Sequence, residues 1–253
     1  MILVGSLTVG LALNVQSKKA RRYLWLLLAF MIVPFFATLS RGSYLALPFV
    51  YAAIAYFRRG KRLRMVVLLV VLSLVGAVFM PSTVVDRVSY TFNQGYTQQE
   101  KKSIGGVELD TSTSERLASW ENALSDGLSS PLWGFGVTGY GFLDAQYPRI
   151  WVETGLLGLL FFFYMIYRVY TESMRLYRET SVPLYRGLAM GLMCGLAGLM
   201  IHALGTNTFI IVRIMEPFWL VCGMVVSAYK IEGEERAPSD AVEADSAPIG
   251  SSS

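Results

Sequence analysis

Long apolar runs separated by short basic clusters restrict the fold of this sequence more than any other feature. The runs lie at residues 1–15, 23–57, 65–80, 150–167, 187–204 and 209–229. A membrane-crossing helix needs about 20 apolar residues, so the run at 23–57 must hold two helices. Its only charged group, in Ser40-Arg41-Gly42, marks the turn between them. The sequence therefore predicts an all-α integral membrane protein, a multi-pass helical bundle with about seven spans.

The composition agrees with a membrane protein and argues against nucleic-acid binding. Hydrophobic residues make up 54% of the chain and charged residues 16%, below the roughly 25% typical of soluble domains. The net charge is +4, but the basic residues lie in clusters between apolar runs, which is how membrane orientation is encoded. Cys194 and Cys222 both lie inside apolar runs. We therefore expect neither a disulfide nor a metal site.

The basic clusters also predict the orientation of the chain. If each apolar run crosses the membrane once, the clusters at 17–22, 58–64 and 171–186 fall on the same side. Loops rich in Lys and Arg stay in the cytoplasm, so we expect that side to be cytoplasmic. The same count places Met1 outside, and we expect further helices to precede this sequence in a longer protein.

Charge and hydropathy divide the chain into four predicted parts. They are about four transmembrane helices in 1–81, an external, periplasmic and largely helical loop in 82–148, about three transmembrane helices in 149–230, and a disordered cytoplasmic tail in 231–253. Disorder is expected in the tail because it is rich in Glu, Pro and Ser and holds few apolar residues.

A helix is predicted inside the external loop, from about Thr113 to Asp126. Ser112 and Glu115 have the spacing of a capping box, and apolar residues follow at helical spacing. Arg116 would lie in the first turn, where exposed backbone N–H groups favour an anion and a guanidinium can bind phosphate oxygens. The alternative is a surface arginine paired with a neighbouring glutamate.

A glycine-rich turn follows the predicted helix. Gly134, Gly136 and Gly139 form a literal G-x-G-x-x-G motif after Pro131. A nucleotide-binding loop needs a strand before it and a helix that opens within it, and neither is predicted here. We interpret the glycines as a tight turn that lets chain or ligand approach closely. The aromatic residues around them can form an interfacial belt or stack on sugar rings.

Ionisable residues lie where the loop enters the next span and near the ends of later spans. They are Asp144, Arg149, Glu153, His202 and Arg213. Placing an ionisable side chain at a membrane span costs free energy, so each of these residues is a functional candidate. Structural alternatives stay open, because Arg149 and Glu153 can pair on one helix face and Arg213 can pair with Glu216. Asp144 can be a plain loop acid, and His202 can bond a neighbouring helix.

These elements together resemble the O-antigen ligase and polymerase family of bacterial surface polysaccharide synthesis. The resemblance is carried, in order, by the Ser40-Arg41-Gly42 hairpin, Ser114-Glu115-Arg116 with Trp120, the Pro-x-x-Gly-x-Gly turn at 131–136, and Asp144-x-Gln146-Tyr147 nine residues ahead of Glu153-Thr-Gly155-Leu-Leu-Gly158. It spans about residues 23–230. It implies a glycosyltransferase of the GT-C kind that acts on glycans carried by undecaprenyl diphosphate, without a metal, a nucleotide sugar or another cofactor.

The resemblance also implies roles for single residues. Arg41 and Arg116 match the two external arginines with which this family engages the lipid diphosphate. Asp144 stands where the ligase branch has a histidine, usually followed by asparagine where this chain has Ala145, and this difference favours the polymerase-like branches. Asp144 is then the first candidate for the catalytic base, and Glu153 is the second. The remaining candidates are supporting residues: Arg149, His202 and Arg213.

The expected location is the bacterial cytoplasmic membrane, with the loop 82–148 outside. Expected partners are an undecaprenyl-diphosphate-linked glycan, a glycan or lipid acceptor, membrane lipid and other polysaccharide-assembly proteins, but no nucleic acid. Two other classes stay open: a multi-pass transporter or sugar-binding membrane protein without catalysis, and an inactive fragment. The apolar runs argue against a transporter, because their few ionisable residues lie mostly near their ends.

Overall fold

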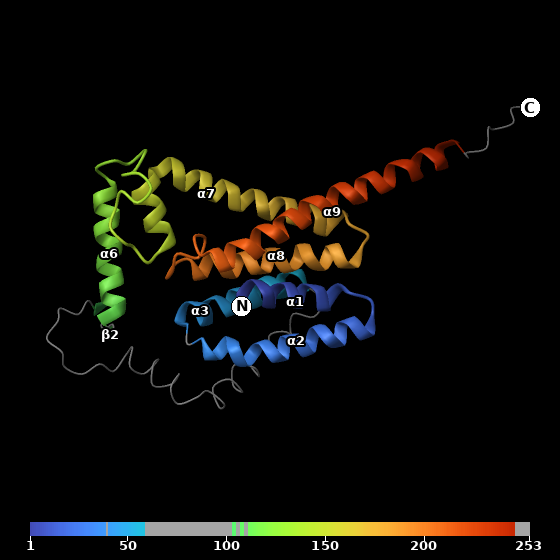
Figure 1. Ribbon diagram of the computed structural model, residues 1–253, viewed down its shortest axis with the longest axis horizontal. Helices are drawn as coiled ribbons and strands as arrows, with labels where there is room; N and C mark the ends of the chain where they lie inside the picture. The colour runs from blue at the N-terminus through green and yellow to red at the C-terminus, as the bar shows by residue number, and fades with distance from the viewer. Residues whose placement is uncertain (39, 59–102, 105–106, 109–110, 246–253) are drawn as a thin grey trace, which may run out of the picture.

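The computed structural model describes the chain except residues 39, 59–102, 105–106, 109–110 and 246–253, and the side chains of Arg41, 103–115 and 233–245. Its helices are α1 (Ile2–Asn14), α2 (Lys18–Ala37), α3 (Arg41–Phe57), α6 (Thr111–Gly127), α7 (Gln146–Glu179), α8 (Pro183–His202) and α9 (Val212–Asp245). The two-residue strands β1 (Ser103–Ile104) and β2 (Val107–Glu108) pair antiparallel. Figure 1 shows the long helices running along one axis, with α6 standing across one end.

Helix α8 lies at the centre of the bundle and contacts α1, α3, α7 and α9. Most of its span is buried, whereas almost none of α2 is. Helix α1 packs closely against α8 because Gly187, Gly191 and Gly195 recur along the contact, and a Cβ atom on Gly191 would lie 2.6 Å from Leu7 Cα. Small residues let membrane helices approach closely enough for dispersion contacts to hold them together.

Within the described residues, four helices are long and apolar enough to cross a membrane. They are α2, α7, α8 and the part of α9 up to Glu232, whereas α1 and α3 are apolar but shorter. The predicted span at 65–80 lies outside the described residues, so the expected count of seven spans is not confirmed. The prediction of a helical membrane protein is confirmed.

The predicted hairpin around Ser40 is confirmed. Helix α2 ends at Ala37 and α3 begins at Arg41. Ser40 caps α3, since its Oγ accepts a hydrogen bond from the Ser43 amide (3.3 Å). The Tyr44 hydroxyl donates to the Phe36 carbonyl (2.7 Å). These bonds satisfy backbone groups at the turn, where the helices offer no partner of their own.

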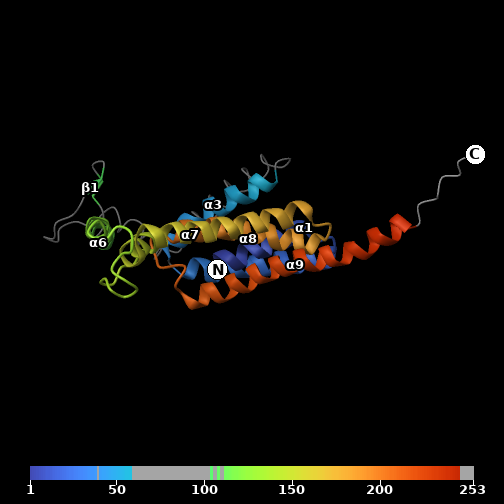
Figure 2. The ribbon, with the colours of Figure 1, turned by 90° about the horizontal axis from the view of Figure 1, so that it is seen from above.

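The two ends of the bundle differ in charge. One end holds the start of α2 at Lys18, the end of α3 and the α7–α8 connection (Figures 1 and 2). There the Arg58 guanidinium donates to the Leu13 carbonyl, and the Arg186 guanidinium donates to the Thr180 carbonyl (2.6 Å). The opposite end holds the α2–α3 hairpin, α6 and the α8–α9 connection. The basic clusters in the described residues therefore gather away from α6.

The helix α9 continues to Asp245, although the sequence predicts disorder from residue 231. Glu232 is buried, and its carboxylate accepts hydrogen bonds from Thr180 Oγ1 (2.5 Å) and from Ser181 N and Oγ (2.8 Å each). These bonds tie α9 to the α7–α8 connection, and the Glu and Ala residues that follow are good helix formers. The structure thus differs from the expected disorder as far as Asp245, and 246–253 lie outside the described residues.

Candidate functional site

The long helix α7 is broken near its start. Gly155 has φ 64° and ψ −165°, which separates residues 146–154 from residues 156–179 by a kink. Glycine adopts this conformation at low cost because it has no Cβ atom. A Cβ atom on Gly155 would lie 2.4 Å from Leu132 C, because the glycine-rich turn at 131–136 is packed into the break.

Backbone hydrogen bonds hold the turn in this break. Two turn amides donate to helix carbonyls, and two helix amides donate to turn carbonyls. The bonds are Phe135 N to Val152 O (2.8 Å), Gly136 N to Glu153 O (2.9 Å), Leu156 N to Pro131 O (2.8 Å) and Leu157 N to Leu132 O (3.4 Å). In an unbroken helix the same four helix groups would bond one another. The prediction of a tight, close-packed turn is therefore confirmed, and the turn binds its own chain.

Arg149 and Glu153 brace the same turn. Arg149 Nε lies 3.0 Å from Glu153 Oε1, and their side chains are only 21% and 11% exposed. Glu153 Oε1 also accepts from the Thr138 amide (3.4 Å). Thr138 has φ 65°, which is uncommon for a β-branched residue and must be held by its surroundings. The pairing of Arg149 with Glu153 is confirmed. The Glu153 carboxylate contacts both Arg149 and an amide of the turn.

The structure brings Arg116 and Asp144 together from two separate segments. Arg116 Nη2 lies 3.1 Å from Asp144 Oδ2, with the side chains 43% and 38% exposed. The predicted helix is confirmed, but it begins at Thr111, so Arg116 lies in its second turn and away from the free amides of the first. The free amides of the helix start are therefore not part of the surroundings of the Arg116 guanidinium. An exposed ion pair contributes little stability and can exchange its partner for a ligand.

A small hydrophobic core supports this ion pair. Ala123 of α6, Leu143 and Val152 of α7 are buried together, with Tyr140 packed against them. The Tyr140 hydroxyl donates to Asp126 Oδ2 (2.6 Å), and this hydrogen bond raises the pKa of the Tyr140 phenol. The core fixes α6 against the start of α7, so the distance between the Arg116 and Asp144 backbones is set by packing.

His202 ends α8 on the same side of the bundle. Its Nδ1 lies 2.8 Å from Thr208 Oγ1 and 3.0 Å from Thr206 Oγ1. Gly42 packs against its ring, because a Cβ atom there would lie 3.4 Å from His202 Cδ2. The start of α3 at Arg41 therefore lies beside His202, although the Arg41 side chain is outside the described part.

Arg213 does not join this group. It is exposed at the start of α9, and Glu216 is also exposed. Among the described side chains no ion pair joins them, so the expected pairing is not found. The described residues also contain no cluster of His, Cys, Asp or Glu that could hold a metal ion.

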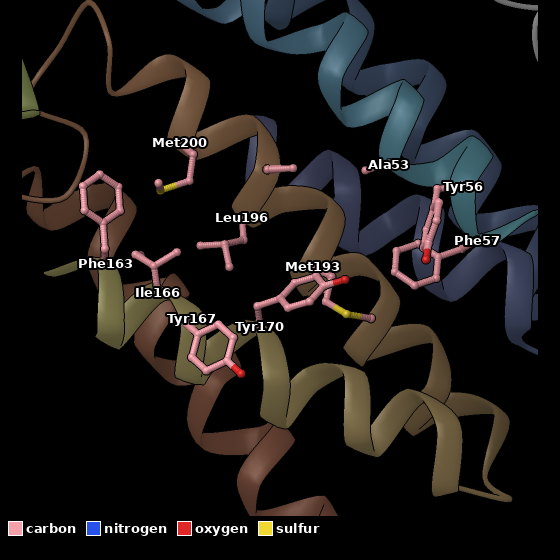
Figure 3. Close-up of a pocket in the computed structure, with 11 residues that line it drawn as sticks. Ala53, Tyr56, Phe57, Phe163, Ile166, Tyr167, Tyr170, Met193, Leu196 and Met200 are labelled. Carbon is pink, nitrogen blue, oxygen red and sulfur yellow. The ribbon is translucent and has the colours of Figure 1, made fainter. Parts of the chain in front are cut away.

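An apolar groove of about 390 Å³ lies between α3 and α7, with α8 as its floor (Figure 3). Tyr56 and Phe57 of α3 lie across it from Phe163, Tyr167 and Tyr170 of α7. Among the described residues, no charged side chain lines this groove. These residues therefore offer a diphosphate no cationic partner there.

The sequence analysis missed the polar residues of the α8–α9 connection. Thr206, Asn207 and Thr208 all pack toward the segment that carries Asp144 or toward His202. The available signal was three consecutive small polar residues between two apolar runs. Such residues are common in any turn, which is why they did not stand out.

Gly155→Ala should destabilise the protein, because the added methyl group meets the Leu132 backbone and must adopt a positive φ. We expect a loss of about 2 kcal/mol or more, seen as a lower midpoint of thermal unfolding in detergent. Gly141→Ala is the matched control, since nothing lies within 4 Å of its Cβ position. Equal midpoints for the two variants would contradict a turn docked in the helix break.

Comparison with known proteins identifies the family of this chain. A family model described as O-antigen ligase matches residues 26–163, more than half of the chain. The matched region contains the α2–α3 hairpin, α6, the glycine-rich turn and the break in α7. No curated protein matches the chain. The chain belongs to the O-antigen ligase family of membrane proteins.

Proposed function

We propose that this protein is a GT-C-like glycosyltransferase that takes a glycan from undecaprenyl diphosphate at the outer face of the bacterial cytoplasmic membrane. One observation carries the proposal. Arg116 and Asp144, a phosphate-binding group and a candidate base, lie 3.1 Å apart at the end of the bundle away from the basic clusters. The O-antigen ligase family acts on polysaccharide and lipid-linked glycans in general.

The reaction is a displacement at the anomeric carbon of the donor sugar. The bond between this carbon and the diphosphate oxygen breaks, and the oxygen keeps the electron pair. Negative charge therefore grows on the diphosphate, and a fixed guanidinium stabilises the transition state more than the ground state. Arg116 holds this role, with Arg41 as the second diphosphate-binding residue at the start of α3. The step needs neither a metal nor a nucleotide sugar.

The acceptor hydroxyl forms the new bond to the anomeric carbon and loses its proton. A carboxylate within hydrogen-bond reach of this hydroxyl can take the proton as the bond forms. Asp144 fits this role better than Glu153, because Glu153 already binds Arg149 and the Thr138 amide. Glu153 and Arg149 then hold the glycine-rich turn in place, and His202 packs against the start of α3.

The exposed Arg116–Asp144 pair suggests an order of events. A diphosphate offers Arg116 a more highly charged, bidentate partner than one carboxylate does. Binding of the lipid diphosphate then draws Arg116 away from Asp144 and frees the carboxylate for the acceptor hydroxyl. The donor would bind first, and the base would become available only when the donor is in place.

A growing glycan is the favoured acceptor, with a lipid as the alternative. Asp144 stands where the ligase branch of the family carries a histidine, so the polymerase-like reaction is slightly favoured. Other partners in this proposal are the membrane lipid around the bundle and further polysaccharide-assembly proteins.

The proposed orientation places α6 outside and the basic end in the cytoplasm, following the distribution of Lys and Arg. Ser129→Cys should react with a membrane-impermeant maleimide in intact cells, and Lys19→Cys should react only after permeabilisation. Both positions are exposed. The unsubstituted protein, with Cys194 buried and Cys222 half-buried, reports the background. The reverse labelling pattern would overturn the orientation and the proposed site with it.

Asp144→Asn should lower glycan transfer about 100-fold or more, because a nearly isosteric amide cannot take the proton. Transfer from a lipid-linked oligosaccharide by the purified protein is the measurement. Glu172→Gln is the matched control, since Glu172 belongs to a similarly exposed pair with Arg168 (2.7 Å). Unchanged turnover in Asp144→Asn would remove Asp144 as the base. No transfer by the unsubstituted full-length protein would favour a transporter.

A further inference from the structure

The segment that carries Asp144 is tied to the end of α8 and to the α8–α9 connection by four hydrogen bonds. They are Asn207 Nδ2 to Leu143 O (2.7 Å), Gln146 N to Ala203 O (3.2 Å), Phe209 N to Gln146 Oε1 (2.9 Å) and Tyr147 Oη to Met200 O (2.6 Å). They bracket Asp144 on both sides, one at the residue before it and three at the two residues that follow Ala145. Each of them joins residues more than 50 positions apart in sequence. We call these four bonds the polar clamp.

Asn207 is the member of the clamp that lies next to Asp144. Its side chain is buried, and its Nδ2 donates to the carbonyl of Leu143, which is itself buried. The Leu143 carbonyl belongs to the peptide bond whose nitrogen is that of Asp144. Because a peptide bond is planar, a hydrogen bond to this carbonyl restrains the direction in which the Asp144 Cα and side chain leave the segment.

Asn207 leaves one of its own buried polar atoms without a partner. Its Oδ1 is buried and has no hydrogen-bond partner among the described residues, and a buried acceptor left in this state is unfavourable. The amide cannot turn over to relieve this, because its oxygen would then face the Leu143 carbonyl. An apolar residue would remove this unpaired acceptor, but it would also take the Asn207 donor away from the Leu143 carbonyl.

We propose that Asn207 is a positioning residue that holds the segment around Asp144, and with it the Asp144 carboxylate, in place for glycan transfer. The proposal rests on the proposed function of Asp144 as the base. It also extends the site beyond the region that the family model matches, since residues 200–209 lie after its end at residue 163. The hydrophobic core fixes α6 and Arg116 from one side, and the clamp fixes Asp144 from the other.

Hydrogen–deuterium exchange of the full-length protein tests the clamp without measuring activity. Asn207→Ala should speed exchange in a peptide that covers 143–147, because the loss of one clamp bond frees the Gln146 amide to open more often. Asn14→Ala is the matched control, since Asn14 Nδ2 also donates to a backbone carbonyl, that of Gly10 (2.7 Å), in a different part of the bundle. Unchanged exchange in 143–147 would refute the clamp.

A double-mutant cycle tests the positioning role. Asn207→Ala should lower kcat about 10-fold or more with little change in KM, because a base displaced by about 1 Å loses its geometry. In the Asp144→Asn background the same substitution should change kcat less than about 3-fold, because the group that it positions is gone. Equal losses in both backgrounds would overturn the proposal and leave Asn207 a structural residue.

Asn207→Asp tests whether the proposal depends on the Nδ2 donor of Asn207. Asn207→Asp is nearly isosteric but places a carboxylate oxygen against the Leu143 carbonyl, so it should lower kcat at least as much as Asn207→Ala. Wild-type kcat in Asn207→Asp would contradict the proposal. If Asp144→Asn keeps full turnover while Asn207→Ala speeds exchange, the proposed base fails and the clamp itself stands.

Discussion

The docking of the glycine-rich turn into the broken helix α7 is the interaction on which the rest of the site depends. A broken helix leaves backbone N–H and C=O groups that need partners from outside the helix. The turn supplies partners for the carbonyls of Val152 and Glu153 and for the amides of Leu156 and Leu157. Because the chain must return to α7 in this way, α6 is held beside the start of the helix. Arg116 then reaches Asp144 from a segment 28 residues away.

The two ion pairs of the site differ in burial, and burial decides whether a pair can exchange its partner for a ligand. The Arg149–Glu153 pair is mostly buried and is combined with an amide of the turn, so removing one partner would leave a buried charge. The Arg116–Asp144 pair is well exposed and contributes little stability. A site that must bind a charged ligand needs groups of the second kind, because the ligand has to replace the existing contact.

Local patterns allowed the sequence to predict the local parts of the structure. The hairpin at Ser40 follows from the length of an apolar run with one charge in it. Helix α6 follows from a capping box and helical spacing, and the pair of Arg149 with Glu153 from residues four apart. The meeting of 143–147 with the α8–α9 connection could not be predicted, because its bonds mostly involve backbone groups that every residue carries. The start of the tail was missed as an ordered segment because the composition does not reveal the tertiary hydrogen bonds of Glu232.

Binding of undecaprenyl diphosphate to the purified full-length protein tests the central claim most directly. The account predicts that Arg116→Gln weakens binding about 10-fold or more, through loss of a charge-assisted contact. Asp144→Asn should bind at least as tightly as the unsubstituted protein, because its competing carboxylate is gone. Arg168→Gln, from the similarly exposed pair with Glu172, should leave affinity unchanged. Equal affinity in all four proteins, or loss of binding in Asp144→Asn, would contradict the account.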